Sequence, residues 1–288
     1  MPATTPDAGP RDDRVLAISR WTTYLVIPVL LLGFVILYLL PEQTERLFAW
    51  PIASRMSAML MGAGYGAGAL FFILSTRERR WHRFGHAMLG ISAFVWPLIL
   101  ATLLHWGKFS HANPAFWLWL VVYLVTPLLL PWLWWRNRVH DDGQPEPGEP
   151  PLPARLRQRF VVGALGCLAI ALWLFLAPTA AAAWWPWPLT PLTARVVAAW
   201  FFLPAAILAI LARDGRWSTA RLTFVSGLVW TLLLLLAVAR AWPEFDPARA
   251  SRIVYPVGLV LALLAQAAML GWLPQASRRR ASPGSSEM

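Results

Sequence analysis

Two polar residues at the start of an apolar segment have the types and the spacing of an anion-binding site. Thr190-Pro191 fits a helix N-cap followed by a proline in the first turn, and Arg195 follows about one turn later. The free backbone N–H groups at a helix start, together with an arginine, suit a carboxylate or a lipid phosphate. The alternative is a capped helix whose Arg195 side chain reaches the lipid headgroups.

A related pattern lies in the first half of the chain. Trp50-Pro51 corresponds to Trp187-Pro188 if one residue is gapped, and Arg55 lies at the equivalent helix start. We therefore predict one ligand-binding region that combines Trp50, Arg55, Trp187, Thr190 and Arg195. Charged residues of the neighbouring loops would form either a polar mouth or ordinary solvated loop charge: Glu42, Glu45, Arg46, Lys108, Glu244, Asp246, Arg249 and Arg252.

No other set of residues in the sequence has the spacing of a catalytic or metal site. Cys167 is the single cysteine, so the chain can form neither an internal disulfide nor a cysteine-based zinc site. His86 and His105 are separated by roughly 28 Å along a helix and cannot share one metal ion. We predict no catalytic residue, cofactor or metal, which favours a non-enzymatic protein. His82 and His86 are expected at the membrane interface, beside an arginine cluster.

The elements that must position these residues are long apolar helices. Hydrophobic residues make up 58% of the chain and charged residues only 14%. The apolar runs reach the roughly 20 residues that a helix needs to cross a bilayer, and they do not alternate as barrel strands do. The sequence therefore predicts an all-α integral membrane protein with eight transmembrane helices. The expected spans are residues 21–40, 56–75, 84–104, 115–135, 160–177, 193–212, 219–240 and 252–273.

Residues 57 to about 113 repeat at a constant offset of 136 residues, which divides the eight spans into two sets of four. The turn Arg-Glu-Arg-Arg-Trp at 77–81 corresponds without a gap to Arg-Asp-Gly-Arg-Trp at 213–217. Each set has an even number of spans, so both enter the membrane from the same side, which predicts two parallel four-helix repeats. The expected domains are an N-terminal segment (1–20), the first repeat (21–135), a proline-rich linker (136–159), the second repeat (160–273) and a tail (274–288), with both terminal segments and the linker unstructured.

These repeated features resemble those of a group of uncharacterised bacterial polytopic membrane proteins over residues 20–273. The shared features are the tandem Trp-Pro-Ile/Leu segment, the Ser/Thr-Ala pair at 57–58 and 193–194, and the arginine-rich turn before Trp. The resemblance implies a multi-pass bacterial protein and no particular activity. The plan also resembles that of haem A synthase, whose two four-helix halves present paired histidines. No histidine here has a histidine counterpart at the 136-residue offset, so this second resemblance covers architecture and not the cofactor.

The positive charge follows the expected topology. Of the 25 Lys and Arg residues, seven lie on one side of the predicted spans and the rest on the side that carries both termini. The positive-inside rule then predicts a bacterial inner-membrane protein with cytoplasmic N- and C-termini. The chain has no nucleic-acid recognition motif, so its net charge of +11 indicates contact with membrane lipids rather than with nucleic acid.

Alternating glycines from Gly62 to Gly68 form small-xxx-small pairs in the second span and predict close packing of a neighbouring helix. We expect a protein that binds or translocates a small amphipathic or lipid-like ligand. One alternative is a membrane enzyme or an assembly factor for haem or another cofactor. The other is a structural or assembly subunit that presents its glycine face to a second copy or to a membrane complex.

Overall fold

The computed structural model describes residues 12–281, with side chains described as far as Gly271. Eight helices in this range are long and apolar enough to cross a membrane, and no strand occurs among the described residues. The chain is therefore an all-α, multi-pass membrane protein, as the sequence predicts. The eight spans are α1 (Ala17–Phe34, continued by a π-helix at Val35–Leu39), α3 (Arg55–Ser75), α4 (His86–Leu104), α5 (Pro114–Asn137), α6 (Ala154–Leu176), α8 (Pro191–Asp214), α9 (Trp217–Arg240) and α10 (Ser251–Ala281).

Short helical turns fill most of the connections, and local capping fixes where several spans begin. The turns are α2 (Thr44–Leu47), α7 (Pro178–Trp184) and single 3₁₀ turns at Pro41–Gln43, Trp81–Arg83, Trp106–Lys108, Arg138–His140 and Trp242–Glu244. Ser54, Asn113 and Thr190 each accept a hydrogen bond from a backbone N–H of the helix that follows. Such side-chain caps satisfy N–H groups that have no partner inside the helix.

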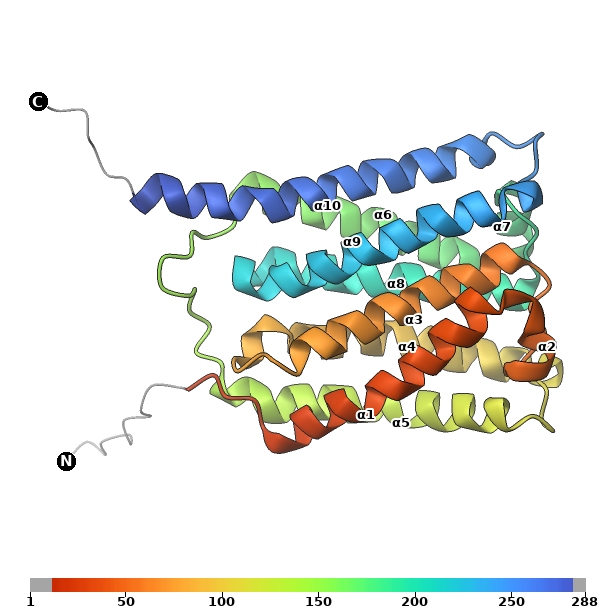
Figure 1. Cartoon of the computed structure of the whole chain (residues 1–288), viewed down its shortest axis with the longest axis horizontal. Coiled ribbons are helices and arrows are strands. Elements are labelled where there is room, and N and C mark those ends of the chain that lie inside the picture. The colour runs from red at the N-terminus through yellow and green to blue at the C-terminus, as the bar shows by residue number, and fades with distance from the viewer. Residues whose placement is uncertain (1–11, 282–288) are drawn as a thin grey trace, which may run out of the picture.

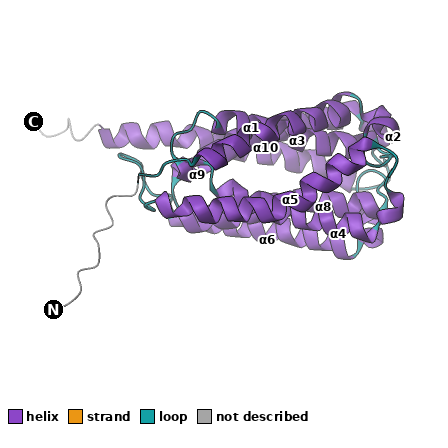
Figure 2. Ribbon diagram, turned by 90° about the horizontal axis from the view of Figure 1, so that it is seen from below, coloured by secondary structure: helices purple, strands orange, loops and turns teal. Residues whose placement is uncertain are grey.

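The eight spans lie in two layers of four (Figures 1 and 2). Neighbours in one layer are α1, α3, α9 and α10, and in the other α5, α4, α8 and α6. Each layer thus takes two helices from each half of the chain, and the contacts α3–α9 and α4–α8 join the halves at the middle of each layer. The two halves therefore lie side by side, with α1, α3, α4 and α5 on one side of these contacts and α6, α8, α9 and α10 on the other. At the 136-residue offset, α3 corresponds to α8 and α9 to α4, so the two central contacts are equivalent.

The loops gather at two ends of the bundle. The basic end, on the left in Figure 1, holds residues 12–16, 76–85, 138–153 and 215–216. The distal end holds residues 40–54, 105–113, 177–190 and 241–250. Any site near residues 40–55 therefore lies far from any site near residues 76–85.

The glycines of α3 allow the close packing that the sequence predicts. A Cβ at Gly62 would lie 2.6 Å from the backbone nitrogen of Tyr38, and one at Gly66 would lie 2.6 Å from the Phe34 ring. A Cβ at Gly64 would lie 2.0 Å from the Trp200 ring on α8. Helices of the same chain therefore fill this face. This glycine face is therefore not free to bind a second copy or another membrane protein, as a structural or assembly subunit would require.

Three segments differ from the sequence expectation. The proline-rich linker is shorter than predicted, because α5 continues to Asn137 and α6 already begins at Ala154. Between them, the connecting segment (residues 141–153) has no helix, but it packs onto the bundle through the buried Leu152. α10 continues to Ala281, past the point where the sequence predicts an unstructured tail.

The N-terminal segment is also anchored, as far as it is described. The Asn137 side chain is fully buried; its oxygen accepts hydrogen bonds from the Leu16 N–H and the Ser19 hydroxyl, and its amide donates to the Arg14 carbonyl. The rest of the segment that the sequence predicts to be unstructured, residues 1–11, lies outside the described range. A buried side-chain amide with all these partners holds residues 14–19 against the end of α5.

Candidate functional site

The first transmembrane span, α1, is continued by a π-helix, Val35–Leu39, which reaches the distal end of the bundle. The Leu40 N–H donates to the Val35 carbonyl, 3.1 Å away, which is the wider bonding pattern of this helix type. Pro41 ends the span, because a residue before proline is disfavoured in the helical conformation; Leu40 has left it, with φ −120° and ψ 47°. Single π turns in long helices are frequent at functional sites.

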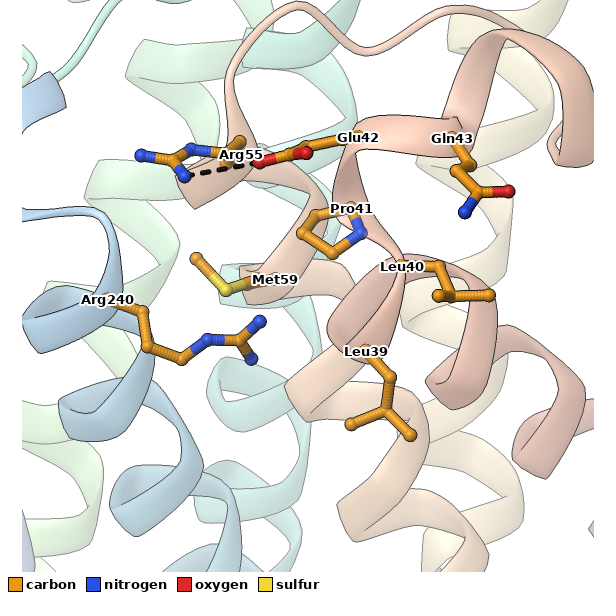
Figure 3. Close-up of a pocket in the computed structure, with 8 residues that line it drawn as sticks. All are labelled: Leu39, Leu40, Pro41, Glu42, Gln43, Arg55, Met59 and Arg240. Carbon is orange, nitrogen blue, oxygen red and sulfur yellow. Dashed lines mark hydrogen bonds and ion pairs between the residues drawn. The ribbon is translucent and has the colours of Figure 1, made fainter.

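A cavity of about 220 Å³ lies beside this helix end (Figure 3). It is formed where the end of α1, the start of α3 and the end of α9 meet. Its lining residues are Leu39, Leu40, Pro41, Glu42, Gln43, Arg55, Met59 and Arg240. Leu39 is 52% exposed and Leu40 is 37% exposed, so the apolar rim lies on the outer surface of the bundle.

Arg240 supplies positive charge to the cavity. Its Nη1 donates a 2.9 Å hydrogen bond to the Tyr38 carbonyl, and the guanidinium lies 5.4 Å from the centre of the Tyr38 ring. In the part of the chain that the structure describes, no carboxylate lies within 4.0 Å of this guanidinium. Its partners are therefore a carbonyl dipole and a ring face, and the charge is available to an anion in the cavity.

Arg55, on the opposite wall, is already ion-paired. Its Nε lies 3.1 Å from Glu244 and its Nη1 lies 3.3 Å from Glu42. The Glu244 carboxylate also accepts hydrogen bonds from the N–H groups of Arg55 and Met56 and from the Ser54 hydroxyl. A carboxylate of the protein itself thus occupies the anion position at the start of α3, where the helix dipole favours negative charge.

The two tryptophans of the predicted site do not line the cavity. Trp50 is 2% exposed and packs against the rings of Phe48 and Phe109, while Trp187 is fully buried. The Trp187 Nε1 donates to the Ser57 hydroxyl at 2.9 Å. Both rings belong to the packed core of the distal end, since large apolar rings gain most when they are removed from water. Neither ring is therefore exposed to a ligand in the cavity, contrary to the prediction.

Thr190 and Arg195 lie elsewhere on the distal end. Thr190 caps α8 as predicted, by accepting from the Thr193 N–H at 3.2 Å. Arg195 donates to the Phe175 carbonyl at 3.1 Å and to the His105 Nε2 at 2.7 Å. Burial, and then the charge of Arg195, lower the pKa of His105. The five predicted residues therefore do not form one site, and Arg55 is the one that lines the cavity.

Arg240 and Met59 are the lining residues that sequence reasoning missed. The 136-residue offset gives only a partial signal: position 59 corresponds to Arg195, whereas position 240 corresponds to Leu104. The carbonyl near the end of the first span of each half accepts from an arginine of the second half, Tyr38 from Arg240 and Phe175 from Arg195. The two arginines come from different helices, so aligning one arginine with another could not find the pair.

His82 and His86 lie at the basic end of the bundle, and other parts of the chain bury both. His82 is 4% exposed and His86 is 6% exposed. The Nε2 of His86 lies 2.8 Å from the Thr223 hydroxyl of α9. Side chains of the N-terminal and connecting segments surround His82. Burial by such distant segments cannot be predicted from the residues next to His82 in the sequence.

The chain matches no protein-family model, no curated protein and no solved structure. The function is therefore inferred from the geometry of the site alone. At the cavity it places a guanidinium without a carboxylate partner, in the described part of the chain, next to a rim of exposed apolar side chains. This combination suits a ligand that joins an anionic group to a hydrocarbon part.

Proposed function

We propose that this protein binds a small amphipathic, lipid-like ligand in the cavity between α1, α3 and α9. The observation that carries the proposal is the position of Arg240, whose charge faces the cavity without a carboxylate partner in the described residues. In a site of low polarity, a charge-assisted hydrogen bond to a phosphate or a carboxylate is stronger than in bulk water. Arg240 would hold the anionic group, and Arg55 would stay paired with Glu244.

The hydrocarbon part of the ligand would lie along the rim of the cavity. Leu39 and Leu40 are exposed at the side of the bundle, and Met59 lies between the two arginines (Figure 3). Methionine adapts to irregular apolar surfaces because its side chain is unbranched and flexible. A ligand could then enter sideways from the lipid, with its head passing the π-helix end and its tail remaining in the bilayer.

The positive-inside rule supports a location for the cavity. Arginines are concentrated at the basic end, which favours a cytoplasmic position for that end and for both termini. The distal end, with the cavity, then belongs to the outer leaflet of a bacterial inner membrane. In this arrangement the ligand comes from the outer leaflet, either to be held there or to be moved onward.

The equivalent contacts of the two layers support an origin by duplication. The pairs α3–α9 and α8–α4 correspond at the 136-residue offset, and a carbonyl near the end of both α1 and α6 binds an arginine. Duplication supplies two similar helix ends. In the second half Arg195 is engaged by the Phe175 carbonyl and by His105, so we assign binding to the first.

Native mass spectrometry of the protein in mild detergent tests this function. The wild-type protein should retain an anionic amphiphile, and Arg240→Gln should reduce its occupancy by about tenfold, the loss expected for one charge-assisted contact. Arg240→Lys, which keeps the charge, should retain part of the binding.

Arg252→Gln is the matched control. Arg252 lies at the same end, stacked on Trp242 at 4.6 Å, and does not line the cavity. Its removal should leave the occupancy unchanged. The proposal is wrong if the wild-type protein retains no such molecule, or if Arg240→Gln and Arg252→Gln retain as much of it as the wild type.

A further inference from the structure

Four separate parts of the chain meet around His82 at the basic end. Asp13 comes from the N-terminal segment, His82 from the turn between α3 and α4, Asp141 and Glu146 from the connecting segment, and Ser218 from the start of α9. The His82 side chain is 3% exposed and that of Asp13 is 11% exposed. Ionisable side chains are rarely this buried unless they are paired with another group, as His82 and Asp13 are.

Backbone contacts hold the Asp13 carboxylate against the His82 ring. The Asp13 N–H donates to the His140 carbonyl at 2.9 Å, and the Asp13 carbonyl accepts from the Trp81 N–H at 2.8 Å. Asp13 has φ +49°, a left-handed conformation that costs free energy for a residue other than glycine. Its Oδ2 lies 2.5 Å from the His82 Nδ1, and its Oδ1 accepts from the His82 N–H at 3.1 Å.

Asp141 completes a set of three side chains. One possible ligand atom from each of Asp13, His82 and Asp141 lies within 4.8 Å of the other two. Asp141 is also bound by Arg216 through two hydrogen bonds of 2.8 and 2.9 Å. Arg216 also donates to the Asp214 carboxylate, in hydrogen bonds of 2.8 and 2.7 Å. Its positive charge therefore keeps a carboxylate partner if Asp141 turns toward a cation.

Carboxylates are numerous around His82. Those of the surrounding network are Asp13, Glu78, Asp141, Glu146, Glu149 and Asp214, and Arg80, Arg83 and Arg216 pair with several of them. Among the groups described, Glu149 accepts only from the Ser218 N–H and hydroxyl and from the Glu146 N–H. Carboxylates held close to a buried imidazole favour the binding of a cation.

We propose that Asp13, His82 and Asp141 form a binding site for a divalent transition-metal ion such as Zn²⁺. One imidazole and two carboxylates are ligands that this class of ion accepts, with water completing the coordination. The His82 Nδ1 would bind the metal as a neutral imidazole whose Nε2 keeps its proton, and the Asp13 carboxylate that now faces Nδ1 would bind the same metal. Metal–ligand bonds of about 2.1 Å require Asp141 to approach and the short Asp13–His82 contact to widen.

A metal at this position would hold three segments together. Asp13 belongs to the N-terminal segment, His82 to the turn between α3 and α4, and Asp141 to the connecting segment that leads into the second half. The inference does not depend on the ligand of the distal end, because the two sites lie at opposite ends of the bundle (Figure 1).

The test uses the full-length protein in detergent, without an affinity tag that contains histidine. After treatment with a chelator and a titration with Zn²⁺, the retained metal is measured by elemental mass spectrometry. The wild-type protein should retain one equivalent. Asp13→Asn and Asp141→Asn should each lose at least tenfold in affinity, whereas His111→Ala, which removes a histidine at the distal end, should retain the metal.

A second measurement covers the possibility that a variant fails to fold. Co²⁺ added to the wild-type protein should produce visible absorption bands of a four- or five-coordinate site with nitrogen and oxygen ligands, and Zn²⁺ should displace them. The proposal is overturned if the wild-type protein retains no metal and shows no such bands. It is equally overturned if folded Asp13→Asn and Asp141→Asn bind the metal as the wild type does.

Discussion

Arg240, the last residue of α9, donates a 2.9 Å hydrogen bond to the carbonyl of Tyr38 in the π-helix that ends α1. These residues are 202 positions apart and come from different halves of the chain. The Tyr38 hydroxyl returns a 2.7 Å bond to the Leu233 carbonyl of α9. The two bonds tie the ends of α1 and α9 together and fix the position of the guanidinium at the cavity.

Replacing Arg240 should therefore cost stability as well as binding. Arg240→Ala leaves the Tyr38 carbonyl without this donor, and we expect a loss of about 1 kcal/mol, a typical net value for one hydrogen bond. Thermal unfolding in detergent measures the effect. Arg46→Ala removes an exposed guanidinium, and in the described structure this side chain bonds only Gln43. The substitution should change stability by less than about 0.5 kcal/mol. An equal effect of both substitutions would contradict the assignment.

The packing of α3 on α8 predicts different outcomes for two glycines. In Gly64→Ala the new methyl group would lie 2.0 Å from the Trp200 ring, and displacing this buried ring should cost about 1–3 kcal/mol. Gly68→Ala places its methyl group 3.5 Å from a Leu30 side chain, an ordinary contact, and alanine also favours the helix. Thermal unfolding should show a lower midpoint for Gly64→Ala and an unchanged or higher one for Gly68→Ala.

A hydrogen bond between the layers predicts a non-additive result. The hydroxyls of Tyr65 on α3 and Tyr123 on α5 lie 2.6 Å apart and are buried. Tyr65→Phe or Tyr123→Phe alone leaves the other hydroxyl without this partner, at a cost of about 1 kcal/mol or more. The double variant leaves neither hydroxyl, so its loss of stability should be smaller than the sum of the two. A double-mutant cycle measures this coupling, and strict additivity would show that the bond contributes nothing.

The pair Arg195 and His105 predicts a dependence on pH. Burial, followed by the charges of Arg195 and Lys108, lowers the pKa of His105, so the folded state favours the neutral ring that accepts from Arg195. The resulting contribution to stability is present above the ordinary histidine pKa of about 6.5 and is lost as the pH falls through the lower value of the folded state. Acid should therefore separate the two side chains.

NMR titration of the labelled histidines measures this pKa directly. The midpoint of His105 should lie below about 6.5 in the wild-type protein. Arg195→Gln removes a nearby positive charge and should move the midpoint upward, whereas Arg252→Gln should not move it. A midpoint that Arg195→Gln leaves unchanged would rule out a charge effect of Arg195 on the ring.

The helices and their caps could be predicted because their signals are local. Long apolar runs define the eight spans, and Thr190-Pro191 begins α8 as its residue types indicate. The glycines of α3 likewise predicted close packing, because a missing side chain permits it whichever helix is the neighbour. In each case the cause lies within a few residues of the feature.

The candidate site could be predicted only in part, because it depends on which helices become neighbours. Arg55 lines the cavity, but Arg240 arrives there only because α9 of the second half packs beside α3 of the first. Trp50 and Trp187 carry the residue type of a ligand-binding surface, yet the same apolar rings are equally suited to the core that they occupy. The burial of His82 likewise depends on Asp13 and Glu146, which the chain brings together from distant positions.

The contacts α3–α9 and α4–α8 between the two halves have a consequence for how the protein is made. The ribosome releases the first four spans before the second half exists, and α3 and α4 have almost no contact with each other. Until α8 is inserted, the surface of α3 at Gly64 lacks its packing partner, the Trp200 ring. Early in biogenesis the first half must therefore wait in the bilayer as two loosely associated hairpins. The two halves, expressed as separate polypeptides, should be stable only when they are produced together.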